Sequence, residues 1–203
     1  MRRHYAGVPF ERYADDAICH LRTRGEAERL KEALARRFEG CGLKLHPEKT
    51  RIVYCKDDRR RSDYEQEKFD FLGYTFRPRL SRRKDGRFYV RFSPAASNKS
   101  IKKMNQRIRA WKLHQKSGRT LQELAQNINV IVRGWFNYYG SYYRSALDIV
   151  SRQVDLHLAK WAERKYKGLR GHSGRALKWV RGIKKRHPEL FVHWQLYSKT
   201  AGL

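Results

Sequence analysis

Residues 10–21 read Phe-Glu-Arg-Tyr-Ala-Asp-Asp-Ala-Ile-Cys-His-Leu, and the acidic pair Asp15-Asp16 separates two short, mainly apolar runs. This pattern is typical of a β-hairpin, with strands at 10–14 and 17–21 and the two acids at its apex. A tight turn would hold both carboxylates in place, and hard divalent cations bind carboxylate oxygens. The plainer alternative is that the aspartates only solvate the turn, where Asp is common in any case.

The residues after this hairpin predict a mixed α/β half that ends near Pro94. Residues 25–41 carry apolar side chains every three or four positions, which predicts an amphipathic helix that Gly40 and Gly42 end. A turn around Pro47 should lead into a strand near 51–54, and the polar residues 56–68 should form an exposed loop. Order resumes at 69–76, and a hairpin follows with strands near 77–81 and 88–92 and Asp85-Gly86 in its turn.

Every pattern after residue 95 is helical. Apolar stripes run through Ile101, Met104, Ile108 and Trp111; through Leu121, Leu124, Ile128, Ile131, Trp135 and Tyr139; and through Leu147, Val150, Val154, Leu158 and Trp161. Short links between these stripes favour a small bundle of neighbouring helices. The residues beyond Gly171 are basic and aromatic, with Trp179, Phe191, Trp194 and Tyr197 among them.

The order of the motifs resembles the group II intron reverse transcriptase/maturase family over about residues 8–178. Three successive blocks of a polymerase palm are similar in sequence: Tyr13–Asp16, Gly42–Thr50 and Phe69–Phe76. Residues 131–140 and 161–167 are similar to the maturase-specific, or X, domain of that family. The resemblance implies an α+β fold, in which a partial palm of antiparallel sheet and helix precedes an all-α thumb. We expect the palm at 1–94, the maturase-specific domain at 95–180 and a basic aromatic tail at 181–203.

The resemblance also implies roles for single residues. Asp15 and Asp16 would be catalytic and would bind magnesium, as in polymerases that use two metal ions roughly 3.5–4 Å apart. Tyr13 and Ala14 would lie beside the primer end and the nucleotide, and Lys49 would face the nucleotide phosphates, although a solvated turn lysine is the simpler interpretation. Phe71, Leu72, Gly73 and Tyr74 would form a strand that grips the primer, with the glycine allowing close approach, or an ordinary buried strand.

Composition points to a polyanionic partner. The 203 residues contain 47 Lys and Arg against 20 Asp and Glu, a net charge of +27, and 13% of them are aromatic. Residues 100–112 and 164–178 are overwhelmingly positive, so we expect RNA phosphate contacts from Lys102, Lys103, Arg107, Arg109, Lys112, Arg133, Arg164, Lys165 and Lys167. Core packing is the more natural role for Trp135, Tyr139 and Trp161.

Other classes of partner and compartment are less consistent with the sequence. No apolar run reaches the ~18 residues of a membrane span, and Met1–His4 does not resemble a secretory signal, which predicts a cytoplasmic, bacterial-type protein. Cys19, Cys41 and Cys55 lack zinc-ligand spacing and are expected to be reduced thiols. No Cys/His cluster that would indicate an endonuclease follows the thumb.

The sequence predicts an incomplete polymerase site. Glu11 is the only acid before Asp15, and the fingers and the earlier palm aspartate of the family are missing. We therefore expect an RNA-directed DNA polymerase by descent that binds intron RNA and primer–template, assists splicing and retrohoming, and is inactive alone unless a complementary N-terminal half completes it. One alternative is a maturase or RNA chaperone without catalysis. Another is a generic basic, ribosome-associated protein, which would make the palm blocks coincidental.

Overall fold

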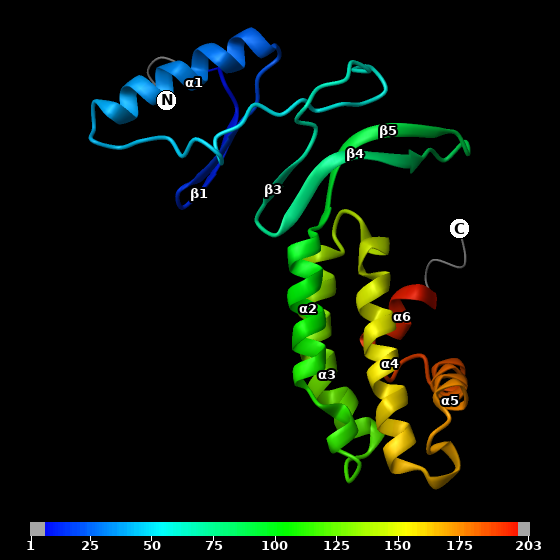
Figure 1. Ribbon diagram of the computed structural model, residues 1–203. Helices are drawn as coiled ribbons and strands as arrows, with labels where there is room; N and C mark the ends of the chain where they lie inside the picture. Colours follow the sequence, from blue (N-terminus) through cyan, green and yellow to red (C-terminus); the bar gives the residue numbers. More distant parts are fainter. Residues whose placement is uncertain (1–6, 199–203) are drawn as a thin grey trace. The chain divides into compact units, whose positions relative to one another are not determined.

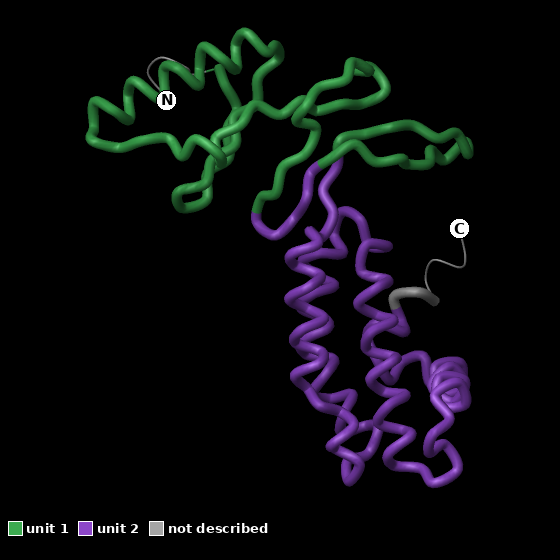
Figure 2. Tube along the Cα trace, viewed as in Figure 1, with its two compact units in different colours: residues 1–71, 77–92 green, residues 72–76, 93–203 purple. Residues whose placement is uncertain are grey.

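The computed structural model describes residues 7–198, without the side chains of 196–198. Met1–His4 and the side chain of Tyr197 lie outside this range. The chain divides into an N-terminal unit, residues 1–71 and 77–92, and a helical unit, residues 72–76 and 93–203 (Figure 2). The fold is α+β, with antiparallel sheets and a helix in the N-terminal part and mostly helices after it.

The N-terminal unit begins with the expected hairpin and helix. Strands β1 (Phe10–Tyr13) and β2 (Asp16–Cys19) pair antiparallel, and α1 (Arg24–Glu39) follows (Figure 1). Thr23 and Glu26 form a capping box at the start of α1, and Gly40 caps its end. The amphipathic helix predicted for 25–41 is therefore confirmed.

One predicted strand in this unit is wrong. Residues 51–56 have no strand structure, although the turn at Pro47–Lys49 before them is present. The backbone of Tyr54 makes two hydrogen bonds: its N donates to Gln66 O at 2.8 Å, and its O accepts from Lys56 N at 3.1 Å. A β-rich sequence needs a neighbouring strand to complete a ladder, and no described strand pairs with this segment.

The loop at 56–68 is more ordered than its composition suggested. Asp58 makes two hydrogen bonds with the backbone of Val90. Asp58 N donates to Val90 O at 3.1 Å, and Asp58 Oδ1 accepts from Val90 N at 2.9 Å. Lys56 forms ion pairs with Asp63 and, at 3.4 Å, with Glu67. The polar side chains therefore fix the loop against a strand.

A second sheet has the order β3-β4-β5, with strands Phe69–Phe71, Tyr74–Arg82 and Phe88–Ala96. The hairpin between β4 and β5 turns at Asp85-Gly86 as predicted, and Gly86 has φ +87°. The strand predicted through Phe71–Tyr74 is wrong. Leu72 and Gly73 have φ of +49° and +79° and form a two-residue turn between β3 and β4.

The helical unit contains α2 (Asn98–Ala110), α3 (Leu121–Tyr139), α4 (Asp148–Lys165), α5 (Ser173–Arg186) and α6 (Val192–Ser198). Short 3-10 helices at Leu113–Gln115, Arg144–Leu147 and Lys167–Leu169 connect them. Helix α4 packs against α2 and α5, and α3 packs against α6 (Figure 1). No helix within residues 7–198 has both the length and the apolar character needed to cross a membrane.

The core of the helical unit follows the predicted stripes with one shift. All five stripe residues of α4 and the preceding turn, Leu147 through Trp161, are fully buried. In α3 the buried positions after Ile128 are Val132 and Phe136, whereas Trp135 and Tyr139 pack at its margin and Ile131 is half-buried. The residues of α3 that face the core are spaced four apart, from Leu124 through Phe136. In the second half of the helix the apolar stripe therefore lies one residue away from the predicted positions.

Residues beyond 180 add to the same core. Phe191 and Trp194 are buried, and Asn129 of α3 holds this segment by donating to Leu190 O and accepting from Val192 N, both at 2.9 Å. The division at 94 and at 180 remains a prediction. The C-terminal segment is nevertheless packed into the helical unit.

The N-terminal unit buries very little. Among its described residues only Leu30 is a buried apolar side chain, whereas the helical unit holds a core of more than twenty buried residues. Burial of apolar area is the main source of folding free energy. The two units therefore differ sharply in how much stability their own packing can supply.

Candidate functional site

The candidate catalytic turn is a two-residue loop one position earlier than predicted. Tyr13 pairs with Asp16 in the ladder, so Ala14 and Asp15 form the apex and Asp16 begins β2. The correction follows from register, because Phe10–Cys19 and Arg12–Ala17 are also cross-strand pairs. Ala14 has φ +53°, which is costly for a residue with a Cβ, and Arg12 Nε donates to its carbonyl at 2.8 Å.

The turn presents its acids to solvent. Tyr13, Ala14, Asp15 and Asp16 are all exposed, with Tyr13 at 63%. As a cross-strand pair, Tyr13 and Asp16 project from the same face with Cβ atoms about 5 Å apart. The structure thus brings together four of the predicted site residues. The carboxylates of Asp15 and Asp16 are open to an incoming ligand.

Asp15 and Asp16 supply two carboxylates, the ligand type that a divalent cation such as magnesium prefers. Within the described residues no group of three or more His, Cys, Asp or Glu side chains could hold a metal ion. Glu11 is two ladder steps from the Tyr13–Asp16 pair, opposite Ile18, and its Oε2 lies 2.5 Å from His20 Nε2. A two-metal site would therefore need further oxygen ligands besides Asp15 and Asp16.

Lys49 lies in the exposed turn at Pro47–Lys49, which Thr50 N closes by donating to His46 O at 2.9 Å. No ion pair of Lys49 is seen within residues 7–198. Its side chain is solvated, as the simpler interpretation expected. A role toward nucleotide phosphates stays a prediction.

The Leu72-Gly73 turn is held by the helical unit. Gly73 O accepts from Ser97 N at 2.9 Å and from Ser100 Oγ at 2.8 Å, and Leu72 O accepts from Tyr138 Oη at 2.9 Å. A Cβ on Gly73 would meet Ser100 Oγ and Tyr139 Oη at 2.9 Å. The glycine permits a close approach by side chains of α2 and α3, and its predicted role in a primer grip stays a prediction.

Tyr74 forms the centre of an aromatic cluster beside this turn. It is buried, its hydroxyl donates to Tyr138 O, and its ring lies 5.2–5.6 Å from those of Tyr138, Tyr139 and Tyr142. Burial and these neighbouring tyrosines raise the pKa of Tyr74 to about 12. Phe71 belongs to β3 of the N-terminal unit, so the predicted primer-grip residues are divided between the units.

The predicted RNA-contacting cations lie on the surface of the helical unit. Eight of the nine are exposed, and none of the eight forms an ion pair with another described residue: Lys102, Lys103, Arg107, Arg109, Lys112, Arg133, Arg164 and Lys167. Residues 97–122 include eight Lys and Arg and no Asp or Glu. The segment therefore has no acid of its own, and the first acid after it, Glu123, pairs with Arg119 at 3.2 Å.

Lys165 differs from the other eight. Its Nζ donates to Ser117 O at 3.0 Å and to Arg119 O at 2.8 Å, and it lies 5.5 Å from the centroid of the Trp161 ring. These contacts hold the loop before α3 against the end of α4. The lysine acts as a structural group, and its ammonium is largely occupied by protein acceptors.

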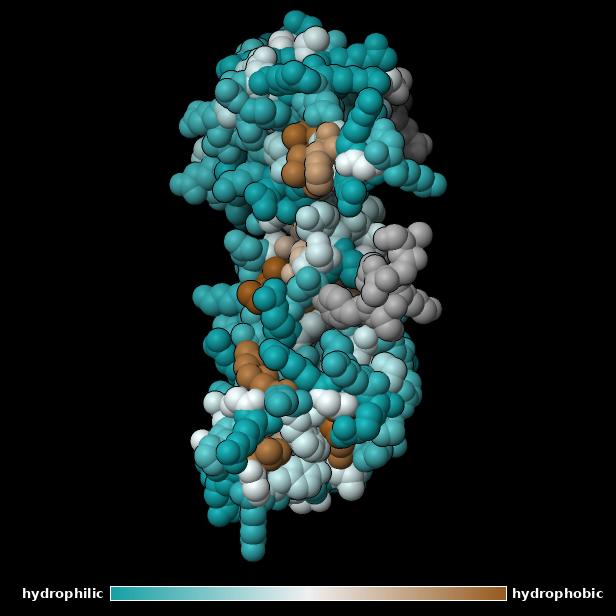
Figure 3. All heavy atoms as spheres, turned by 90° about the vertical axis from the view of Figure 1, so that its right-hand side faces the viewer, coloured by the Kyte–Doolittle hydropathy of each residue, from teal (hydrophilic) through white to brown (hydrophobic). Residues whose placement is uncertain are grey.

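Sequence reasoning gave too little weight to α5. Residues 164–186 contain ten Lys and Arg and no Asp or Glu, and Arg170, Arg175, Lys178, Arg181, Lys185 and Arg186 are exposed. The view of Figure 3 shows mostly hydrophilic residues with small, separate apolar patches. In the sequence, the feature that indicates this surface is the uninterrupted basic run 164–186. The predicted RNA contacts end at Lys167, although the same basic run continues through α5.

Two family models match this sequence. Residues 1–76 match the model described as reverse transcriptase (RNA-dependent DNA polymerase), and residues 101–181 match the group II intron maturase-specific domain. The first range contains the Tyr13–Asp16 turn, and the second contains α3, α4 and most of α2 and α5. No curated protein matches the sequence.

Proposed function

Because the chain belongs to the group II intron reverse transcriptase/maturase family, with part of a reverse transcriptase domain followed by the maturase domain, we propose that it binds group II intron RNA through its helical unit and assists splicing. The observation that carries this proposal is the acid-free, exposed cationic surface of α2 and α5. Phosphate groups of structured RNA are the partner that such a surface attracts most strongly.

The N-terminal unit is proposed to be a polymerase palm that acts only when completed. Asp15 and Asp16 would supply two carboxylates for magnesium, which stabilises the charge that develops during nucleotidyl transfer. The remaining ligands would come from a complementary reverse transcriptase half. The meagre burial within this unit supports the same idea, because a partner would cover apolar side chains such as Leu43 and Leu80, which are 58% and 59% exposed.

A second candidate function is an RNA-binding maturase without catalysis, in which the palm serves as a scaffold. The absence of a third nearby acid among the described residues favours this interpretation of the isolated chain. Under the first candidate, completion restores complementary-DNA synthesis and intron mobility by retrohoming. Under the second, it does not.

The test is splicing of a group II intron RNA at a magnesium concentration where the RNA alone splices slowly. We expect the chain to accelerate splicing, Asp15→Ala/Asp16→Ala to retain that effect, and Lys102→Gln/Lys103→Gln/Arg107→Gln to lose most of it. In a complex with a complementary N-terminal half, the aspartate variant should abolish complementary-DNA synthesis if the first candidate holds. Acceleration that is unaffected by the three cation replacements would refute the assignment of RNA binding to this surface.

A further inference from the structure

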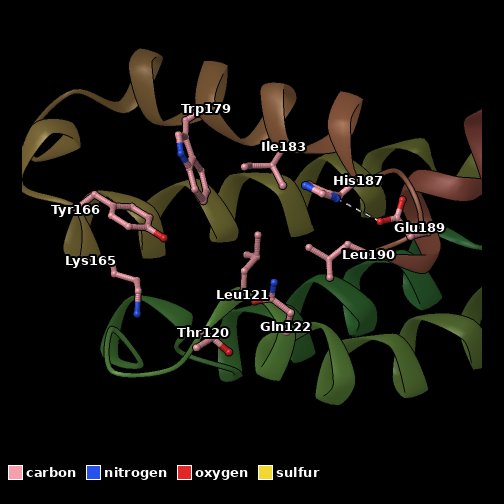
Figure 4. A pocket seen from close by; sticks show the side chains of 10 residues that line it. All are labelled: Thr120, Leu121, Gln122, Lys165, Tyr166, Trp179, Ile183, His187, Glu189 and Leu190. Carbon is pink, nitrogen blue, oxygen red and sulfur yellow. Dashed lines mark ion pairs between the residues drawn. The ribbon is translucent and has the colours of Figure 1, made fainter.

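A cavity of about 520 Å³ opens in the helical unit between the start of α3, the end of α4 and α5 (Figure 4). Tyr166 follows the last turn of α4 and Trp179 projects from α5, and both point into this space. Leu121, Ile183 and Leu190 provide the apolar remainder of the wall. The volume is within the range of small-molecule sites, which suits a planar group the size of a nucleobase.

The tyrosine ring is fixed by tryptophans. Its centroid lies 5.2 Å from that of Trp179 and 6.0 Å from that of Trp161, which is fully buried. Tyr166 nevertheless remains 38% exposed. Because Tyr166 and Trp179 are already in contact, a base has no room between them and would stack on the open face of Tyr166. A ring held rigid in advance loses little entropy when a ligand stacks on it.

Charge around the cavity selects the kind of ligand. Arg164 and Lys167 lie within two residues of Tyr166, Lys178 is next to Trp179, and all three are exposed. The segment 164–186 has no acid, and the carboxylate that lines the cavity, Glu189, has its Oε1 3.4 Å from His187 Nδ1. A stacked base carries a phosphate on either side, so an aromatic face with exposed cations close to it in the sequence matches a single-stranded nucleotide. Gln122 at the rim offers both an amide donor and an acceptor to a base edge.

We propose that this cavity binds one unpaired nucleobase of an RNA loop or end, stacked on Tyr166, while the surrounding cations bind its phosphates. The proposal rests on the proposed RNA-binding function and adds to it a site that distinguishes single-stranded from duplex RNA. The cationic surface alone cannot make that distinction, because phosphates are common to both.

The test compares two RNAs with the same number of phosphates: a hairpin with a short uridine overhang and a blunt hairpin. Using the full chain, we expect the overhang RNA to bind about tenfold more tightly, the typical effect of one stacked base. Tyr166→Leu should remove this preference and leave affinity for the blunt RNA unchanged, whereas Tyr166→Phe should retain it because stacking needs only the ring. Tyr64→Leu, which removes a 41% exposed tyrosine of the N-terminal unit, is the control and should behave as wild type.

The outcomes separate the two claims. If the wild-type chain binds neither RNA, the proposed function fails. If it binds both RNAs equally, or if Tyr166→Leu weakens both to the same degree, RNA binding stands and the base site is overturned. As a second measurement, 4-thiouridine in the overhang should photocrosslink to the peptide that contains Tyr166 or Trp179. A crosslink confined to other peptides would also overturn the site.

Discussion

Gly73 shows at the scale of one residue why the predicted strand became a turn. Its φ of +79° is disfavoured for any residue with a Cβ, and Ser100 and Tyr139 leave no space for one. Gly73→Ala should therefore lower the free energy of unfolding by about 2–3 kcal/mol, combining backbone strain with the displaced side chains. Chemical denaturation measures this change.

The matched control is Gly134→Ala in α3. Nothing lies within 4 Å of the added Cβ, and alanine favours helix over glycine. This variant should be stabilised by about 0.5–1 kcal/mol. Equal effects of the two replacements would show that the turn is not packed as described.

His193 gives the helical unit a pH-dependent stability. It is fully buried, Nε2 lies 2.9 Å from Asp155 Oδ1, and Nδ1 has no partner among the described residues. Burial lowers the pKa of His193, and the Asp155 carboxylate opposes that shift only in part. In the unfolded chain the imidazole of His193 binds a proton at a pKa of about 6.5. Below that pH the unfolded chain therefore binds a proton that the folded chain does not. Because of this difference, the free energy of unfolding falls as the pH drops below about 6.5.

Thermal melting at pH 7.5 and 5.5 tests this. Wild type should lose more stability on acidification than His193→Gln, which keeps an amide donor toward Asp155 but does not titrate. Burial also lowers the pKa of His157, but that residue is present in both proteins and its effect cancels. Identical losses in the two proteins would mean that His193 titrates normally.

At the scale of single elements, local signals predicted most of what formed. The stripe of α4 and the helix after Thr23 follow from periodicity and capping, which are properties of the nearby sequence. The strand expected at 51–54 depends on a distant partner, and the Leu72-Gly73 turn depends on Ser100 and Tyr138 far along the chain. Local patterns carry no information on either.

Lys165 allows a prediction that separates a structural cation from an RNA-binding one. Lys165→Met should destabilise the helical unit by about 1–2 kcal/mol, because two loop carbonyls lose a charged donor. Lys167→Met, at an exposed neighbour with no such bonds, should change stability by less than about 0.5 kcal/mol but weaken RNA binding. Thermal melts and RNA titrations of both variants measure this, and a reversed pattern would contradict the assignment.

At the scale of the whole molecule, the sequence predicted the α+β order and the family but only part of the candidate site. It located the Tyr13–Asp16 turn to within one residue and most of the exposed cations. It could not show that Lys165 is engaged by carbonyls or that Tyr166 and Trp179 border a cavity. Such features arise from side chains that meet only after the helices pack.

Primer extension tests the proposal that the polymerase site is incomplete. Within residues 7–198, Asp15 and Asp16 supply too few ligands for two magnesium ions, so we expect the isolated chain to give no extension above background with a primed RNA template. Robust incorporation that Asp15→Ala abolishes would show that this chain assembles a complete site by itself.

The most direct test of the central claim, that the helical unit binds intron RNA, compares two variants of equal charge. One replaces Lys102, Lys103 and Arg107 of α2 with Gln, and the other replaces the exposed Lys31, Arg36 and Arg37 of α1 with Gln. Affinity for intron RNA is measured against salt concentration. We predict that the α2 variant binds more weakly and that the α1 variant matches wild type. For the α2 variant, the slope of log affinity against log salt concentration should become shallower by roughly 0.7–0.9 for each phosphate that it no longer neutralises. Equal weakening by both variants, or by neither, would contradict the account.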